Sequence, residues 1–499
     1  MYKAYITTLT NVRKHPNADR LLLADVFGNT VCVSTDYAEG EIGVYFPTDG
    51  QLSVEFAEQN NLIRKKDENG NNIGGYMDPD KRNVTAIRLR GEKSDGLFLP
   101  LSCLYYTGVN FDTLNVGDVI DGLVNGHEIC CKYIPRSNTP RCTETKSNKT
   151  RKKKVPTAPL FKEHADTEQL AYNLSAFKPG DEIEITLKMH GTSQRTGYLP
   201  VLQGYADTWP CRVGNAFRHI MRKMGCYHGE DVHDGEPIYD YGYVSGTRRV
   251  VLENYEGGFY GDNQFREQHS KVFEGKLWKG ETVYYEVVGF TTSGAPIMAS
   301  ASNSKLNDKE FIKQYGKETV FSYGCSPTGP QIAYDGLGNE IVRFSTAPQS
   351  DIYVYRMTMT NPDGEVVEYT PDFMRYRCEQ MAVKTVPVFF RGRITCAGIH
   401  GDGAFEYHIS DGIKMGACYG DGAIGDMIRA AAEEFYDGPD PVGKTHVREG
   451  VVVRIINRPK FTAYKHKNFS FKVLSNIAVA DAEASGATEG MSEDMLAEM

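Results

Sequence analysis

Three lysines of this 499-residue chain stand three positions before a glycine: Lys93 in KSDG, Lys188 in KMHG and Lys313 in KQYG. A lysine amine attacks phosphorus only when it is deprotonated, which requires nearby cations, a metal or partial burial. It also needs groups that hold a polyphosphate and offset the charge developing on it. A pattern this short arises by chance, so at most one of the three is expected to be a nucleophile.

Acids and a lysine pair that suit such a reaction follow Lys188 along the chain. Glu286 stands among apolar and aromatic residues in VYYEVVGF, and Glu449 opens the apolar run of REGVVVRI. A carboxylate followed by several apolar residues is poorly placed as a surface charge, which favours a site. In YKHKNF, Lys465 and Lys467 are two positions apart, so a strand would present both on one face.

In their order, these segments resemble the motifs of the covalent nucleotidyltransferases, the superfamily of ATP-dependent DNA and RNA ligases and mRNA capping enzymes. KMHGTS is similar to the first motif, VYYEVVG to the third, IYVYRM to the aromatic motif that follows, REGVVVR to the fourth and KHK to the fifth. This order selects Lys188. Lys93 lies upstream of the whole set, and Lys313 falls after the third motif in a segment predicted as a helix that ends at Gly316.

Two features resemble RNA ligases rather than DNA ligases. Position 190 is a histidine, and KMHGTS is similar to the Lys-x-His-Gly-Thr form of RNA ligases, whereas DNA ligases and capping enzymes have aspartate there. Only 32 residues follow Lys467, too few for the OB barrel that follows the fifth motif in those enzymes. FKEHADTEQL, SGTRR and GKTHVREGVVVR look like the RNA ligases that seal nicks in duplexes whose 3′-OH strand ends in RNA, a group with an N-terminal OB-like domain.

The resemblance implies an ATP-dependent RNA ligase of RNA repair. Lys188 would attack the α-phosphorus of ATP to form lysyl-AMP, AMP would pass to a 5′-phosphate, and a 3′-OH would displace it. The implied cofactors are ATP and a divalent metal, Mg or Mn, and the implied partner is RNA or a nicked duplex that contains RNA. Two alternatives stay open: an RNA- or tRNA-binding protein with a degenerate nucleotidyltransferase domain, and an enzyme of the DNA ligase or capping type.

The same resemblance implies roles for the charged motif residues. Lys465 and Lys467 would act with the nucleophile Lys188, holding the α-phosphate and favouring the neutral amine. Glu286 and Glu449 would bind the metal, directly or through water, or take the ribose hydroxyls.

Aromatic and guanidinium groups would complete the nucleotide site. Tyr355 would stack on adenine, although strand alternation leaves Tyr353 on the same face and the choice between them open. Arg248 in SGTRR, and Arg195 in TSQRTG, would contact ribose or the receiving 5′-phosphate, because a guanidinium fork suits phosphate oxygens.

Two further segments carry weaker assignments. Glu168 and Gln169 in HADTEQ would read the adenine edge, and a helix cap at Asp166 and Thr167 is an equal alternative. His190 is expected to be structural, because no partner histidine or cysteine stands at ligand spacing.

Composition and periodicity predict an α+β protein of several domains. Residues 1–136 alternate short β-segments with turns, which predicts a small barrel. The resemblance implies that this is an OB-like β-barrel that binds nucleic acid, and KHPNADRLLLADV resembles tRNA-binding OB modules. Residues 137–159, with seven basic residues and one acid, suggest a flexible linker. In 160–475, strands such as DEIEITL and FSFKVLS alternate with helices such as GNAFRHIMRKM and IGDMIRAAAEEF, as expected for a nucleotidyltransferase domain of antiparallel sheets with flanking helices. Residues 476–499, with six acids and no base, are expected to form a mobile tail.

The bulk properties suit a cytoplasmic protein. The net charge is −9, and the eleven cysteines show no C-x-x-C pair, as expected for reduced thiols. The first residues lack an apolar signal core, and no apolar run is long enough to cross a bilayer. We therefore expect no membrane partner and presume a monomer.

Overall fold

The computed structural model describes most of the chain from residue 2 to residue 485. The exceptions are 71, 135–154, 165, 230, 253–254, 256–262, 335–336, 338–339, 403–405, 410–411, 416–417 and 421–422. Most of the predicted basic linker, 137–159, therefore lies outside the described residues, as does 486–499 of the predicted tail. No helix within the described ranges is both long and apolar enough to span a membrane.

The N-terminal unit, residues 2–134, consists of small antiparallel sheets around an apolar core. The first sheet has the order β12-β5-β1-β13, formed by β12 (Leu97–Pro100), β5 (Ile42–Phe46), β1 (Ala4–Thr8) and β13 (Val119–Ile120). The second is β2 (Thr10–Lys14), β3 (Leu21–Val26) and β4 (Asn29–Ser34), and the third is β16 (Cys130–Lys132), β6 (Gly50–Leu52) and β9 (Asn83–Val84). Among the described residues these strands form separate sheets and no closed barrel, so the expected OB-like barrel is not confirmed.

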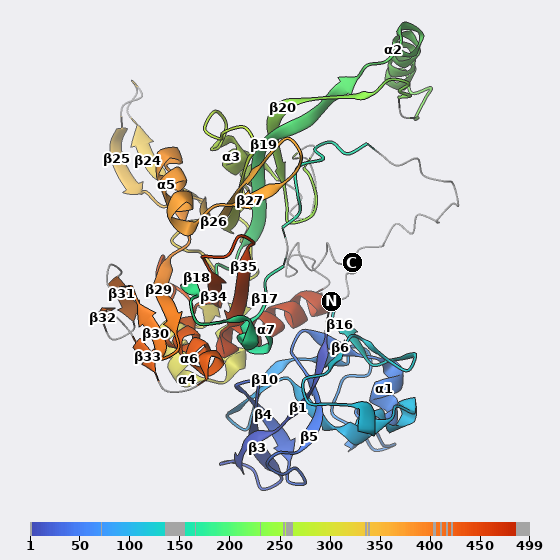
Figure 1. The fold of residues 1–499 in the computed structure, drawn as a ribbon, viewed down its shortest axis with the longest axis vertical. Helices are drawn as coiled ribbons and strands as arrows, with labels where there is room; N and C mark the ends of the chain where they lie inside the picture. The colour runs from blue at the N-terminus through green and yellow to red at the C-terminus, as the bar shows by residue number, and fades with distance from the viewer. Residues whose placement is uncertain are drawn as a thin grey trace.

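Two large sheets form the rest of the molecule (Figure 1). The seven-stranded sheet has the order β17 (Glu168–Gln169), β35 (Thr462–Lys467), β34 (Gly450–Ile455), β18 (Glu182–Leu187), β29 (Val388–Thr395), β30 (Gly398–Gly401) and β33 (Cys418–Gly420). The six-stranded sheet has the order β20 (Pro237–Gly246), β19 (Thr192–Tyr205), β21 (Glu281–Gly289), β26 (Ser350–Thr360) and β27 (Val366–Glu368), and β28 (Lys384–Thr385) pairs with β26. The predicted α+β architecture with antiparallel sheets is therefore confirmed.

Each large sheet has an apolar face that is covered by helices. Helix α6 (Ile424–Tyr436) covers the seven-stranded sheet, and α3 (Gln264–Lys271) and α5 (Pro371–Met381) pack on the six-stranded sheet. Alternation explains this layering, because successive residues of a strand point to opposite faces. In β34, for example, Val451 and Val453 are buried in the core under α6, whereas Val452 faces the other way.

Strands β19 and β20 extend beyond the other strands as a hairpin that ends in α2 (Trp209–Lys223) (Figure 1). We call this hairpin with α2 the arm. The predicted helix in GNAFRHIMRKM is thus confirmed as part of α2, which has no buried residue.

The C-terminal segment differs from its prediction. FSFKVLS was expected to be a strand, but α7 runs from Phe469 to Ser485, so the first ten residues of the expected tail belong to a helix. The side chain of Asn468 accepts the backbone N–H of Ser470 at 2.7 Å, which caps the helix start. Phe471 and Leu474 are buried at helical spacing, and this tertiary packing outweighs the apparent alternation.

Of the two other Lys-x-x-Gly lysines, one lies in a strand, where a turn was expected, and the other lies in the helix expected for it. Lys93 belongs to the hairpin strand β11 (Glu92–Asp95), and its Nζ lies 5.5 Å from the ring centre of Phe469 in α7. Lys313 lies in α4 (Lys309–Tyr315), which ends at Gly316 as predicted. Neither of these lysines lines the cleft described next.

Candidate active site

A cleft between the two large sheets brings together residues that are far apart in the sequence. It opens onto about 820 Å³ of space. Four residues expected at the site line it: Lys188, Arg248, Glu286 and Tyr355. The other lining residues are His164, Thr167, Glu184, Thr186, Leu187, Met189, Met374, Arg375, Val386, Val452, Arg454 and Phe461.

Lys188 reaches the cleft because it continues the alternation of β18. The apolar residues of this strand point into the core, and Glu184 and Thr186 between them line the cleft. Lys188 follows Thr186 by two positions and therefore lies on the same side. Its backbone N–H donates to the carbonyl of Gly450 at 3.0 Å, and its Nζ lies 2.7 Å from Oε1 of Glu449.

Glu449 is a buried carboxylate surrounded by cations. Its Oε1 lies 2.7 Å from Nζ of Lys188 and 3.7 Å from Nζ of Lys467. Burial alone would raise the pKa of Glu449, but Lys188, the imidazole of His190 and Lys467 together hold that pKa well below its usual range. Glu449 therefore stays ionised and acts as the common counter-ion of the two lysines.

His190 has the structural role expected of it. Its backbone N–H donates to the Tyr323 hydroxyl at 2.7 Å, and its ring packs edge-on against Phe321 and Phe471 at 4.5 and 4.7 Å. Its Nδ1 lies 3.5 Å from Oε2 of Glu449. Burial lowers the pKa of His190, although Glu449 opposes this, so a neutral imidazole supports the position of the carboxylate.

Two motif glycines stand where the backbone leaves no room for a side chain. A Cβ on Gly191 would lie 2.3 Å from the carbonyl oxygen of Val287. A Cβ on Gly450 would lie 2.1 Å from that of His466, and the φ of Gly450 is +146°. Gly191 thus lets the first motif pack against β21, and Gly450 lets β34 begin directly beside β35.

Lys465 and Lys467 share one face of β35, as predicted. Lys465 is opposite Val452 of β34, which lines the cleft, and Lys467 is opposite Gly450. Burial, with help from the charges of Lys467 and Lys188, lowers the pKa of Lys465 to about 8. Burial also tends to lower the pKa of Lys467, but Glu449 raises it above its usual value.

The lowered pKa of Lys465 predicts that its phosphate binding weakens at alkaline pH. The ammonium is present below about pH 8 and is lost as the pH rises through that value. We expect kcat/KM for ATP in lysyl-AMP formation, measured from about pH 6 to 10, to fall above about pH 8. Lys465→Arg should shift this fall to higher pH, because arginine stays charged. An unchanged fall in the arginine variant would assign it to another group.

A β-bulge separates the roles of the two candidate tyrosines of β26. The register with β21 shifts so that Tyr284 is opposite Arg356 and Tyr285 is opposite Val354, which leaves Tyr355 as the extra residue. Tyr355 lines the cleft, and its hydroxyl lies 3.0 Å from Oγ of Ser193.

Tyr353, by contrast, is only 4% exposed and packs in the core under the seven-stranded sheet. Tyr353 does not line the cleft. The structure therefore favours Tyr355 as the stacking residue.

Glu286 and Glu449 are suitable ligands for a divalent cation. Glu286 lines the cleft from β21, and it is opposite Ser193 in β19. Oε2 of Glu449 is buried, and its 3.5 Å contact with Nδ1 of His190 does not meet the geometry of a hydrogen bond, so within the described ranges this oxygen has no hydrogen-bond donor. Buried carboxylate oxygens are preferred ligands of Mg²⁺ and Mn²⁺, so the donor set fits the expected metal.

The remaining nucleotide-binding candidates lie at the edge of the same site. Arg248 lines the cleft and forms an ion pair with Asp166. Glu168 and Gln169 form β17, which pairs with β35 so that Gln169 is opposite Lys465. The helix cap considered for this segment is absent from the described residues, where β17 stands instead.

Arg195 does not line the cleft, so the structure does not support the expectation that it contacts a phosphate. It is 1% exposed, its Nε donates to the carbonyl of Thr247 at 3.0 Å, and its guanidinium also bonds the carbonyl of Lys162. The guanidinium lies 4.2 Å from the ring centre of Phe161. Arg195 therefore ties the segment before β17 to the arm strands and has a structural role.

Several polar residues of the cleft were not expected from the sequence. Glu184 forms an ion pair with Arg375 at 2.9 Å, and Nη2 of Arg454 donates to the carbonyl of Tyr369 at 3.1 Å. Alternation in DEIEITL and REGVVVRI placed Glu184 and Arg454 on the faces opposite the apolar residues, a signal that was available. Arg375 lies in α5, and no pattern related that helix to the site.

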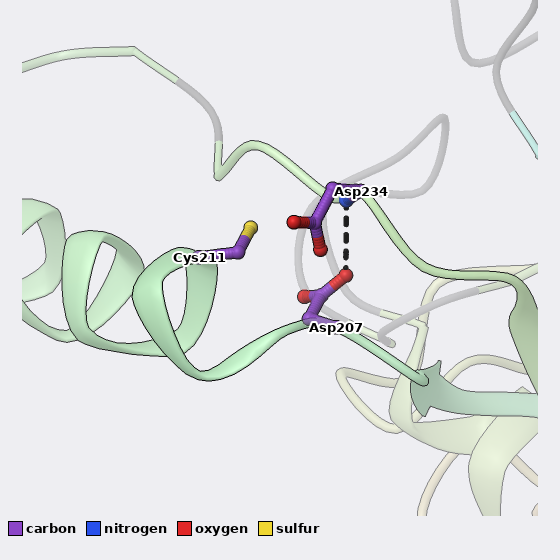
Figure 2. A group of neighbouring side chains, drawn as sticks. All are labelled: Asp207, Cys211 and Asp234. Carbon is purple, nitrogen blue, oxygen red and sulfur yellow. Dashed lines mark hydrogen bonds between the residues drawn. The ribbon is translucent and has the colours of Figure 1, made fainter.

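Within the arm, another group with metal-ligating atoms lies where the β19–β20 hairpin meets α2. Ligand atoms of Asp207, Cys211 and Asp234 lie within 4.8 Å of one another (Figure 2). Asp207 accepts the backbone N–H of Asp234 at 3.1 Å, and Asp234 accepts that of Thr208 at 3.0 Å. Nδ1 of His233 lies 2.7 Å from Asp207. These bonds fix the start of α2 to the β19–β20 hairpin. They explain why the three side chains lie close together without a metal.

Comparison with solved structures finds matches of low sequence identity. Structures of an RNA ligase are among them. A variant of the Naegleria gruberi RNA ligase with ATP and Mn has a TM-score of 0.49 and 15% identity, covering 94% of this chain and 98% of that one. The same ligase with PPi has a TM-score of 0.48 and 16% identity, covering 94% and 97%. A variant with AMP and Mn has a TM-score of 0.48 and 15% identity, covering 94% and 98%. No protein-family model and no curated protein matches the chain.

Proposed function

We propose that this chain is an ATP-dependent RNA ligase that joins a 3′-OH end to a 5′-phosphate end through lysyl-AMP. The observation that carries the proposal is that a lysine, a carboxylate and an aromatic ring line one cleft, with a second carboxylate beside that lysine and a lysine pair on the adjoining strand. Lys188 lies 2.7 Å from the buried Glu449, with Lys465 and Lys467 on the adjoining strand. Structural ion pairs alone do not explain why Lys188, Glu286 and Tyr355 line one cleft.

In the first step, Nζ of Lys188 attacks the α-phosphorus of ATP. A P–N bond forms, the bond from the α-phosphorus to the bridging oxygen breaks, and pyrophosphate leaves. The proton of the ammonium passes to solvent, because Glu449, whose pKa is far below its usual range, holds a proton poorly. Lys465 and Lys467 hold the α-phosphate while its negative charge increases.

In the two later steps, AMP is transferred and then released. An oxygen of the 5′-phosphate attacks the same phosphorus, the P–N bond breaks, and Lys188 regains its proton. The 3′-OH then attacks the 5′-phosphate, loses its proton to solvent and displaces AMP, which leaves a phosphodiester. Glu286 and Glu449 would hold the divalent cation, which offsets phosphate charge when bound.

RNA is proposed as the substrate on two grounds. The first is the Lys-x-His-Gly form of the first motif, in which His190 supports Glu449. The second is the N-terminal unit, which contacts the two-sheet region: Lys472 of α7 lies 2.6 Å from Asp95, and the charge of Asp49 contributes to the raised pKa of Lys467. We propose that this unit, with the OB-like function expected of residues 1–136, binds the nucleic acid beside Lys188.

A sealing assay tests the substrate. Nicked duplexes are prepared in which each of the three strands is RNA or DNA in turn, and joining is measured with ATP and Mg²⁺ or Mn²⁺. We expect joining only when the 3′-OH strand ends in RNA. Equal joining of an all-DNA nick would contradict the RNA assignment, and covalent labelling by GTP in preference to ATP would favour a capping-type enzyme.

A further inference from the structure

His164 is a buried cleft residue to which the mechanism above gives no role. It is 8% exposed and lines the cleft. Its ring centre lies 5.3 Å from those of Tyr355 and Tyr284 and 5.8 Å from that of Phe461. Its backbone N–H donates to the carbonyl of Arg248 at 3.1 Å. The imidazole is therefore held beside the tyrosine on which a base would stack.

The neighbouring Arg356 determines which ring nitrogen of His164 carries the proton. Nδ1 of His164 lies 3.0 Å from Nη1 of Arg356. A guanidinium only donates hydrogen bonds, so Nδ1 accepts, and the proton of the neutral ring is on Nε2. Arg356 is itself fixed by Glu368, whose Oε1 accepts from Nε at 2.8 Å. The tautomer is thus imposed by a buried ion pair.

The charge state of His164 is equally constrained. Burial, followed by the charges of Arg356, Arg248 and Arg195, holds the pKa of His164 well below its usual value. The ring is neutral at physiological pH. It presents one N–H donor, on Nε2, and no acceptor on that side.

That donor has no partner within the part of the chain that the structure describes. The hydrogen bonds of His164 there involve only its backbone N–H and Nδ1. The residue as a whole is about nine-tenths buried and lines the cleft, so a ligand bound there can supply an acceptor for Nε2–H in place of water. The cleft that His164 lines is the space in which this acceptor would lie.

We propose that His164 is a base-binding residue whose Nε2–H donates a hydrogen bond to a ring nitrogen of the adenine stacked on Tyr355. The inference rests on the proposed function, because it takes the bound nucleotide to be ATP. N1, N3 and N7 of adenine are all acceptors; a bond to N1 would also discriminate against guanine, whose N1 carries a hydrogen. A fixed, uncharged donor suits an unprotonated ring nitrogen and does not depend on pH near neutrality.

The test combines changes on both sides of the bond. ATP and its 1-deaza, 3-deaza and 7-deaza analogues each lose at most one ring nitrogen, and kcat and KM for pyrophosphate release are measured with the full chain. We expect one analogue to lose about tenfold in kcat/KM, mainly through KM, as for one neutral hydrogen bond. If all three analogues perform like ATP with the wild-type chain, the inference is overturned without any variant.

His164→Phe identifies the donor. Phenylalanine keeps the packing against Tyr284 and Phe461 but has no N–H. We expect kcat/KM of this variant to be about tenfold lower with ATP than that of the wild-type chain. With the sensitive analogue the variant should lose no further kcat/KM, because the hydrogen bond is already absent. His164→Gln, which can donate from a similar position, should recover part of the loss. If the loss caused by the sensitive analogue and the loss caused by His164→Phe multiply, the two changes act independently. The ring of His164 would then only pack and would not donate to the base.

The outcomes keep the inference separate from the function on which it rests. A covalent AMP adduct on the wild-type chain supports the proposed function whatever the analogues show. If no adduct forms with ATP or any analogue, the proposed function fails first. An adduct that forms equally well with every analogue overturns only the role of His164.

Discussion

Lys188→Ala is expected to abolish the covalent AMP adduct that forms with α-labelled ATP and a divalent metal. The alanine has no amine that could attack the α-phosphorus of ATP. We expect a loss of at least about a thousandfold, measured as label that stays with the denatured protein. Label retained by this variant would show that another residue is the nucleophile.

Three control variants separate chemistry from folding. Lys188→Arg keeps a cation beside Glu449, yet a guanidinium does not attack phosphorus, so this variant should be folded and equally inactive. Lys93→Ala and Lys313→Ala remove the lysines of the two similar patterns, which lie in β11 and α4. Both should form the adduct at close to the wild-type rate.

Glu449→Gln is expected to have the second largest effect, on stability as well as activity. The amide removes the negative charge shared by Lys188 and Lys467 and leaves both cations without it. Breaking a buried ion pair on one side costs about 3 kcal/mol of the free energy of unfolding, measured by urea denaturation. Adduct formation should fall about a hundredfold or more, because the carboxylate also positions Lys188.

The stability difference between Glu449→Gln and wild type should depend on pH. Since the pKa of Glu449 is lower in the folded state than in the unfolded chain, its contribution is fully present above the unfolded value. The difference should therefore be complete at neutral pH and shrink as the pH falls below about 4. Glu433→Gln is a matched control. This carboxylate is 41% exposed, and its ion-pair contact with His466 is long at 3.8 Å, so the free energy of unfolding should change little. Equal losses in both variants would contradict the special role of Glu449.

Much of the site could be predicted because its motifs lie on strands with regular alternation. Lys188, Lys465 and Lys467 follow from parity within β18 and β35, and the order of the motifs selected Lys188 over Lys93. Their placement together is what the sequence predicted; their catalytic roles stay predictions for the assays above. The α+β architecture was predictable for the same reason.

The misses have physical causes that a local pattern does not contain. Arg195 looked like a phosphate ligand, but backbone carbonyls of a distant segment bind it. Phe469 and Phe471 alternate as in a strand, yet Asn468 caps a helix there. His164 gave no signal, because its importance comes from Arg356, which is 192 positions away.

The bulge in β26 has a consequence for how this strand can change. Strict alternation would turn Arg356 into the apolar core that holds Val354 and Met357, where its charge would have no counter-ion. Because of the extra residue, Tyr355 lines the cleft, Arg356 contacts His164 and Glu368, and Met357 returns to the core. Deleting or inserting one residue here would turn the cleft-facing side chains into the core and the core side chains outward. We therefore expect the strand to tolerate substitutions far better than a change in its number of residues.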